Sequence, residues 1–384
     1  MRTTKRHIRI CCQAACIVLA VAVPPSFAET VEQVVYRDEQ QQQHVVTGRI
    51  LVEAADGGVM LQSADGAIAA ITAEQIVERE NRDEQFRPHT AEELSAQLKQ
   101  EFGDRFEITR TKHYVICSDA GAAYADWCGG LLERLYAGFE NYWSRRDFEF
   151  TEPQFPLTAI VFANQRDFAD FATADAGPET ATAKGYYSLK TNRVVLYDLS
   201  KMKQNRAARN VAEINRRMAR TPFNTATVVH EATHQIAFNC GLHTRYADNP
   251  LWFTEGMAMF FETPDLRSRS GWKTIGKLNS VRMNRFKQFG RRRTADSLRT
   301  LIESDARLLD AQTAEDAYAE SWALSYFLLK TRGDAYADYL KALAAKKPLR
   351  FGTPQERIAE FQTAFGEDLN KLEQEWLRFM QRAK

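Results

Sequence analysis

The chain has 384 residues, of which 44% are hydrophobic and 26% are charged. It contains 51 lysine and arginine residues against 50 aspartate and glutamate residues, which gives a formal net charge of +1 at pH 7. This near balance provides no electrostatic basis for binding nucleic acid or an acidic membrane, and the length allows a small accessory domain beside a larger one.

Residues 1–28 have the pattern of a signal peptide. Four basic residues among the first nine precede an apolar run at residues 10–23, and Ser26 and Ala28 place small side chains where a signal peptidase reads them. We therefore expect cleavage after Ala28 and export, to the periplasm or out of the cell. The apolar run is shorter than the about 20 residues that cross a bilayer, so no stable membrane span is expected after cleavage. An uncleaved anchor is the alternative.

Residues 29–85 are expected to form a small β-rich accessory domain. Over residues 45–76 the apolar positions alternate or form short runs, interrupted by two Asp-Gly turn signals that are typical of β-hairpins. This pattern predicts an antiparallel sheet or barrel, whose surface could bind a protein partner. We interpret the polar residues 40–43 as a linker and the charged, proline-containing residues 78–89 as a domain boundary.

The rest of the chain divides into two parts. Residues 86–205 are expected to mix strands and helices, and residues 206–384 to be mainly helical. The predicted elements of the first part are helices at 90–102 and 121–144, strands at 113–118 and 157–162, and a hairpin at 185–196 with its turn at 190–193. The overall prediction is an α+β fold, with a small N-terminal β domain followed by a larger domain that has a mixed β/α upper part and a helical lower part.

Three of the six cysteines lie in the expected signal peptide, which leaves Cys117, Cys128 and Cys240. An odd number of cysteines in an oxidising compartment allows one disulfide and one free thiol, and Cys117 and Cys128 are the candidates for the disulfide. The three have no metal-ligand spacing, so we expect structural roles for them.

The sequence His-Glu-Ala-Thr-His at residues 230–234 places two histidines four residues apart. On a helix, His230 and His234 project about 40° apart on one face, close enough to share a metal ion. Glu231 projects about 100° away, where it can reach a water molecule on the metal without being a ligand. Thr221-Pro222 is a typical start signal for this helix. The alternative is a pair of ordinary core histidines.

A third candidate ligand, Glu255, follows His234 by 21 positions within a second expected helix at residues 249–262. Two imidazoles and one carboxylate are a typical ligand set for a hydrolytic zinc ion, which keeps one position open for water. The alternative for Glu255 is a helix N-terminal carboxylate that is stabilised by the helix dipole.

These motifs resemble the gluzincin superfamily of zinc metallopeptidases, in which the third ligand is a glutamate on the next helix. More narrowly, several phrases resemble a family of exported bacterial proteins, the DUF1570 group of the peptidase MA-like clan. The phrases are His113-Tyr114-Val115-Ile116, Gly185-Tyr186-Tyr187, residues 230–238 and residues 318–324. The resemblance covers roughly residues 90–345 and implies a zincin-like metallopeptidase domain with Zn²⁺ bound by His230, His234 and Glu255.

The resemblance also implies further site residues. Tyr318 corresponds to the tyrosine with which gluzincin aminopeptidases stabilise the oxyanion, although Ser321 replaces a glycine of that pattern; packing on its own helix is the alternative role. The hairpin with Tyr186 and Tyr187 corresponds to the edge strand that binds an extended substrate, and a plain sheet edge is the alternative. The aminopeptidase motif Gly-x-Met-x-Asn is absent from the sequence, which favours an endopeptidase.

The expected function is therefore an exported zinc peptidase that acts on peptides or proteins, with Glu231 as general base and Tyr318 as oxyanion donor. Asp248, Glu262 or a backbone carbonyl is expected to orient the histidine rings, because Met259 stands where some gluzincins have a carboxylate. Two alternatives remain open, namely a non-catalytic zinc-containing binding or scaffold protein of the cell envelope, and a zinc amidase that acts on a non-peptide bond.

Overall fold

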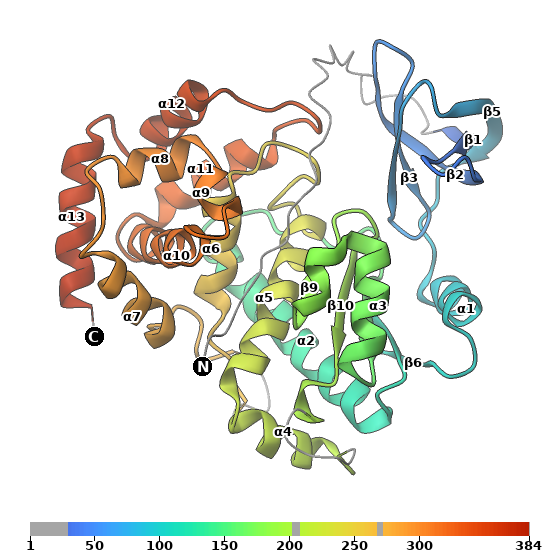
Figure 1. Cartoon of the computed structure of the whole chain (residues 1–384), viewed down its shortest axis with the longest axis horizontal. Helices are drawn as coiled ribbons and strands as arrows, with labels where there is room; N and C mark the ends of the chain where they lie inside the picture. The colour runs from blue at the N-terminus through green and yellow to red at the C-terminus, as the bar shows by residue number, and fades with distance from the viewer. Residues whose placement is uncertain (1–29, 202–207, 267–271, 384) are drawn as a thin grey trace.

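The computed structural model describes residues 30–201, 208–266 and 272–383. The signal peptide expected at residues 1–28 lies outside the described residues. The fold is α+β, as predicted. Figure 1 shows the N-terminal sheet, in blue, at one side of the molecule and the C-terminal helices, in orange and red, at the other, with the second sheet and its helices between them.

The N-terminal sheet has five antiparallel strands in the order β4-β3-β2-β1-β5. Its strands are β1 (Thr30–Arg37), β2 (Gln43–Glu53), β3 (Val59–Ser63), β4 (Ile68–Ile71) and β5 (Ile76–Gln85). Val34, Val59, Leu61 and Ile71 form a small core of their own. The antiparallel sheet expected between residues 45 and 76 is thus confirmed.

The structure differs from two expectations for this region. Residues 40–42 of the presumed linker belong to the tight turn between β1 and β2, in which the Asp38 carboxylate accepts hydrogen bonds from the backbone amides of Gln40 and Gln42, and Gln43 begins β2. Most of the presumed boundary belongs to β5, which pairs with β1. Charged residues are compatible with this edge strand because most of its side chains are exposed while the backbone pairs.

The second sheet has the strand order β6-β7-β8-β10-β9. Its strands are β6 (Glu107–Arg110), β7 (Tyr114–Ser118), β8 (Leu157–Phe162), β9 (Gly185–Tyr187) and β10 (Arg193–Tyr197). The three central strands are parallel, and β6 and β9 pair antiparallel at the two edges. The strands predicted at 113–118 and 157–162 and the hairpin at 185–196 are confirmed, and β9 is an edge strand.

Helices cover this sheet and build the rest of the molecule. The predicted helices at 90–102 and 121–144 are confirmed as α1 (Ala91–Phe102) and α2 (Ala122–Ser144), whereas β6 and α3 (Gln165–Ala176) were not predicted. The helical region contains α4 (Val211–Ala219), α5 (Pro222–Asn239), α6 (Leu251–Phe261), α7 (Ser280–Phe289), α8 (Ser297–Glu303), α9 (Ala306–Leu309), α10 (Ala314–Thr331), α11 (Gly333–Ala344), α12 (Pro354–Phe365) and α13 (Leu369–Arg382). Its mainly helical character agrees with the prediction.

The helix α5 lies against β9 and β10 and also packs on α6, which in turn packs on α10. Gly256 allows the close approach of α6 and α10, because a Cβ atom at this position would lie 2.6 Å from the carbonyl oxygen of Ser321. The β9–β10 hairpin thus contacts α5, α5 contacts α6, and α6 contacts α10.

The predicted disulfide is wrong. Cys117, Cys128 and Cys240 are buried free thiols. Ile116 of β7 contacts Gly129 of α2, and side chains alternate along a strand, so Cys117 points to the opposite face of the sheet from the helix that carries Cys128. The two sulfur atoms are thus separated by the sheet itself.

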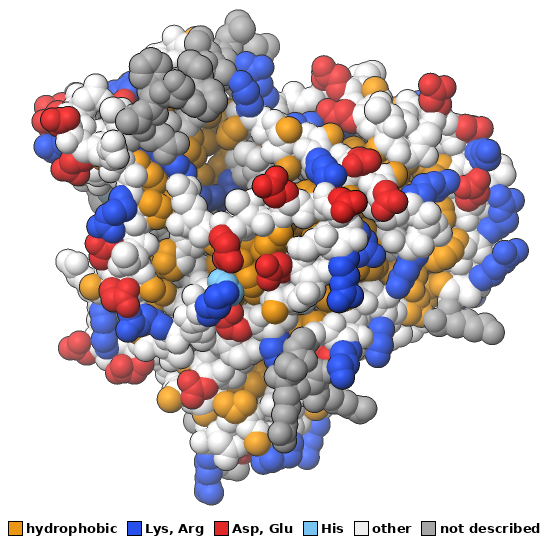
Figure 2. Space-filling model, turned by 180° about the vertical axis from the view of Figure 1, so that it is seen from behind, with side chains coloured by type: hydrophobic (Ala, Val, Ile, Leu, Met, Phe, Trp, Pro, Cys, Tyr) orange, Lys and Arg blue, Asp and Glu red, His pale blue; other side chains and the backbone are white. Residues whose placement is uncertain are grey.

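Within the described ranges, no helix combines the length and the apolar character that a membrane crossing requires. On the face of the molecule shown in Figure 2, basic and acidic side chains are interspersed, with apolar side chains between them. The expectation that the protein does not bind nucleic acid stays a prediction.

Candidate metal centre

The two candidate histidines lie on α5, whose start follows the sequence signal. Pro222 is at the beginning of the helix, where its missing N–H costs no hydrogen bond, and the chain leaves the helix at Cys240 before Gly241 adopts a φ of +84°. Val228, Ala232 and Ile236 bury the inner side of α5. This burial fixes the rotation of the helix about its axis, so the histidines face α6.

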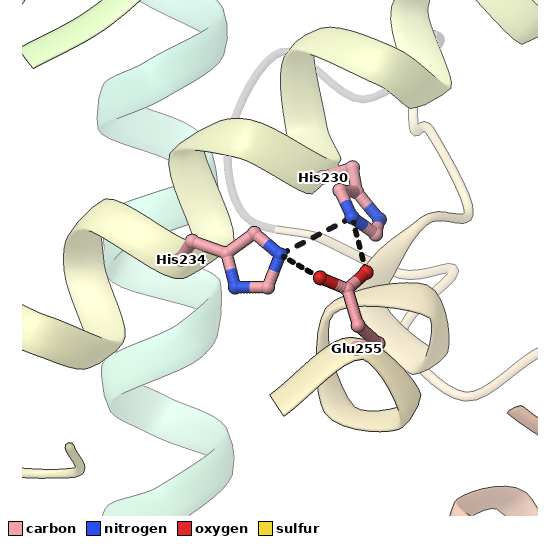
Figure 3. Close-up of side chains that lie close together, drawn as sticks. All are labelled: His230, His234 and Glu255. Carbon is pink, nitrogen blue, oxygen red and sulfur yellow. Dashed lines mark hydrogen bonds and ion pairs between the residues drawn. The ribbon is translucent and has the colours of Figure 1, made fainter. Parts of the chain in front are cut away.

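The side chains of His230, His234 and Glu255 converge between α5 and α6 (Figure 3). The Nε2 atom of His230 is 3.1 Å from one carboxylate oxygen of Glu255, and the Nε2 atom of His234 is 3.5 Å from the other. The two Nε2 atoms are 3.2 Å apart. Together, these three residues form a group that could hold a metal ion.

This geometry fits a tetrahedral metal ion. Ligands about 2.0 Å from a tetrahedral centre lie about 3.3 Å from one another, which is close to the spacing of these donor atoms. Two neutral imidazoles and a carboxylate are also donors that zinc prefers. The three side chains are 10–15% exposed, so the group is nearly buried and still accessible to a small molecule.

Charge interactions within the group are strong. Burial alone would raise the pKa of the Glu255 carboxyl, but the neighbouring imidazoles of His234 and His230 outweigh it and hold the pKa well below its usual range. Burial alone would lower the pKa of His230, but Glu255 outweighs it and the pKa is raised. The carboxylate therefore stays ionised and attracts a cation to this position.

Glu231 lies beside this group and is not part of it. Its carboxylate accepts a hydrogen bond of 3.1 Å from the backbone amide of Tyr187, at the edge of the sheet. Gly185 in the same strand is equally close, since a Cβ atom there would lie 3.8 Å from Cγ of Glu231. Burial, assisted by the charge of Glu255, raises the pKa of the Glu231 carboxyl. A carboxyl with a raised pKa is suited to exchange protons near neutral pH.

Tyr318 of α10 is buried close to the same carboxylates. Burial raises the pKa of its hydroxyl, and the charges of Glu255 and Glu231 add to the effect. A phenol in these surroundings stays protonated and can act as a hydrogen-bond donor. The structure thus brings together Tyr318, Glu231 and the three candidate ligands.

The side chains of Tyr186 and Tyr187 point into the protein. The hydroxyl of Tyr186 donates to Asp175, and that of Tyr187 donates to Asn192, while the Tyr187 ring stacks on Phe238. Both tyrosines are less than 10% exposed. The part of β9 that faces the candidate site is its backbone, through the Tyr187 amide.

Of the expected orienting residues, Asp248 has other partners. Its carboxylate is buried and pairs with Arg357 and with Lys346, the latter at 3.0 Å. Glu262 also pairs with a guanidinium, that of Arg282, but its charge helps to raise the pKa of His230. Of these two carboxylates, Glu262 is the one whose charge affects the pKa of His230. Nδ1 of His230 is buried and has no hydrogen-bond partner among the described residues.

Residues 224–350 match the model of a family that is described as a protein of unknown function, DUF1570. These residues form a DUF1570 domain. The DUF1570 domain contains all three candidate ligands together with Glu231 and Tyr318, whereas both sheets lie before it in the chain. Among curated proteins, none matches the chain.

Several residues that shape the site of the DUF1570 domain were not singled out from the sequence. Gln235 and Asn239 of α5 bond to the backbone and side chain of Asn192 in the β9–β10 turn. His243 is fully buried between Phe238 and Phe253, where burial and the nearby His234 lower its pKa to about 3. Amide side chains and a lone histidine have no distinctive spacing, so the sequence carries no signal for these contacts.

Proposed function

We propose that the protein is an exported zinc-dependent peptidase that cleaves peptide bonds within its substrates. The observation that carries this proposal is the position of Glu231, a carboxylate beside three converging metal donors and not one of them. A structural zinc ion is normally closed by four protein ligands, whereas a hydrolytic zinc ion has three and an open position. Among the described residues, the donor group contains three members.

The residues of the chain have separate roles in this proposal. His230, His234 and Glu255 would hold Zn²⁺, which when bound polarises a substrate carbonyl and lowers the pKa of water. Glu231 takes a proton from the attacking water and delivers it to the leaving amine, as its raised pKa allows. The Tyr187 amide keeps the Glu231 carboxylate directed toward the site.

Tyr318 completes this assignment as the donor to the developing oxyanion. Its hydroxyl is held in a buried environment beside Glu255 and Glu231, where a hydrogen bond to a growing negative charge is stronger than in water. An internal cleavage site is favoured because β9 is an edge strand, so an extended chain can lie along it in both directions.

The test is cleavage of a mixed peptide library by the purified protein, combined with metal analysis. We expect about one zinc ion per chain, internal cleavage of peptides, loss of cleavage with a chelator and recovery when Zn²⁺ is added. The Glu231→Gln variant, prepared in the same way, excludes a contaminating peptidase because it should bind zinc and cleave nothing. Cleavage by this variant at the wild-type rate, or a wild-type protein that binds no zinc, would refute the proposal.

A further inference from the structure

The loop after α5 contains a buried arginine that joins two distant parts of the chain. Arg245 is 8% exposed. Its guanidinium donates one hydrogen bond of 3.1 Å to the carbonyl oxygen of Leu189 and another of 2.8 Å to that of Gly66. Within the described residues, no carboxylate lies at ion-pair distance from it. A buried guanidinium that bonds to carbonyl groups of two separate segments fixes the backbone of both.

These two segments are the β9–β10 turn and the β3–β4 turn of the N-terminal sheet. They also contact each other directly, since the backbone amide of Ile68 donates to the carbonyl oxygen of Lys190 at 2.7 Å. Gly66 has a φ of +84°, and a Cβ atom there would lie 3.2 Å from the side-chain nitrogen Nδ2 of Asn192. The N-terminal sheet is therefore packed closely on the hairpin that borders the candidate site.

The opposite side of the same turn is held by the helix that carries the histidines. The Gln235 side chain donates to the carbonyl oxygen of Asn192 at 2.9 Å, and the side chains of Asn239 and Asn192 exchange hydrogen bonds of 2.8 Å. The turn thus lies between α5 on one side and Arg245 with the N-terminal sheet on the other. Tyr187, which bonds to Glu231, is the last residue of β9 and precedes Leu189 by two positions in the chain.

We infer that the N-terminal sheet is part of the substrate-binding apparatus and that Arg245 is a positioning residue for the β9 edge. The β3–β4 turn and Arg245 hold the β9–β10 hairpin against α5, so that the β9 backbone stays in place for an extended peptide. This inference rests on the proposed peptidase function. It gives the N-terminal sheet a role in the reaction itself, in addition to any partner that its outer surface binds.

The first test compares Arg245→Met with Arg49→Met in the full chain. Arg49 also links the N-terminal sheet to the rest of the molecule, through Gln154 at 2.7 Å, a residue that lies outside the hairpin. We expect Arg245→Met to raise KM for peptides about tenfold, the size expected for a lost hydrogen bond to a charged donor, with kcat within about twofold of wild type. Zinc content should not change, and Arg49→Met should leave KM unchanged.

A second measurement does not depend on activity. In Arg245→Met, the backbone amides of residues 185–192 should exchange with deuterium faster than in wild type, whereas those of β8 should exchange at the wild-type rate. If this variant does not fold, Asp65→Ala replaces it, because the Asp65 carboxylate accepts from the Ala67 amide and shapes the β3–β4 turn from the other side.

The outcomes separate this inference from the proposed function. A wild-type protein that cleaves no peptide refutes the function, and the exchange measurement then decides alone whether Arg245 holds the hairpin. An active wild type with unchanged KM and unchanged exchange in Arg245→Met overturns the inference and leaves the function intact. An equal rise of KM in Arg245→Met and Arg49→Met also overturns it, because the effect would then follow from general docking of the sheet.

Discussion

Two carboxylates on neighbouring helices of the DUF1570 domain, one fully buried and one nearly so, are paired in different ways. Glu320 of α10 is fully buried in an arginine cluster, where it pairs with Arg293 and Arg307, each at 2.7 Å, and accepts a hydrogen bond from Ser297. Glu255 of α6 belongs to the candidate metal centre, where its close partners are the imidazoles of His230 and His234.

The difference lies in the partners. A guanidinium is always protonated, so Glu320 is permanently paired and serves to connect α10 with the segments before it. An imidazole can lose its proton near neutral pH, and in its neutral form it is a metal ligand. Among the described residues, the ion-pair partners of Glu255 at the candidate metal centre are two imidazoles, whereas those of Glu320 are guanidinium groups. This contrast leads to the following predictions.

The largest effect is expected for His234→Ala. The variant should lose zinc, with affinity reduced at least about a hundredfold, and peptide cleavage should become undetectable, because two of three ligands do not hold the ion in place. Metal analysis after dialysis measures the loss. His44→Ala, which changes a histidine of the N-terminal sheet, is the control and should bind zinc normally. Normal zinc content in His234→Ala would remove this residue from the ligand set.

Glu231→Gln should separate metal binding from catalysis. The amide oxygen of glutamine can still accept the hydrogen bond from the Tyr187 amide, so the local structure and the zinc content should be preserved. Loss of the proton acceptor should reduce kcat about 10²–10⁴-fold. The measurement is kcat with zinc quantified in the same sample, and an unchanged kcat would show that another group is the base.

Glu320→Gln should lower the stability of the protein without changing its zinc content. Removing the charge leaves Arg293 and Arg307 buried without their counter-ion, which should lower the free energy of unfolding by about 3–5 kcal/mol. Urea unfolding measures this change. The control is Arg292→Gln, which removes an exposed guanidinium from Asp316, a carboxylate that keeps Arg285 as a partner, and should cost about 0–1 kcal/mol. A loss of zinc in Glu320→Gln would contradict the separation of the two regions.

Tyr318→Phe should reduce kcat about 10²–10³-fold, because one donor to the oxyanion is removed. Zinc content and KM should stay close to those of wild type. Tyr326→Phe, two turns further along α10, is the matched control and should retain full activity. Equal activity of the two variants would assign Tyr318 to packing.

The smallest effect concerns acid stability. Burial alone would raise the pKa of the Asp248 carboxyl, but Arg357 and Lys346 outweigh it, so the pKa lies below its usual value in the folded protein. The stabilisation by Asp248 is therefore fully present above about pH 4, the pKa in the unfolded chain, and is lost as the pH falls through the folded pKa. Urea unfolding between pH 5 and pH 3 should show a weaker pH dependence in Asp248→Asn than in wild type. An identical pH dependence would show that the pair does not lower the pKa.

The convergence of His230, His234 and Glu255 could be predicted from the sequence because its information is local. Two histidines four residues apart must share a helix face, and Glu255 lies on the next helix along the chain. By contrast, Arg245 bonds to carbonyl oxygens of residues 56 and 179 positions away, and no side-chain pattern marks a carbonyl acceptor. The sequence also does not predict the contact between Glu231 and the Tyr187 amide, because this contact depends on which strand forms the edge of the sheet.

The errors in the fold prediction have the same origin. The strand β5 is rich in charged residues, and only its pairing with β1 makes it a strand. The disulfide prediction rested on the number of cysteines, which does not indicate the face of β7 to which Cys117 points or the position of α2, which carries Cys128. Periodicity predicts the elements that bury one face, and it does not predict how those elements are paired.

The close crossing of α6 and α10 at Gly256 has a consequence for how this protein can change during evolution. Gly256 is adjacent to the ligand Glu255, and Ser321 lies one turn after Tyr318 on the facing helix. The spacing between ligand and donor is thus set by contact of two backbones. A substitution of Gly256 by any larger residue would push α6 and α10 apart and so separate Glu255 from Tyr318.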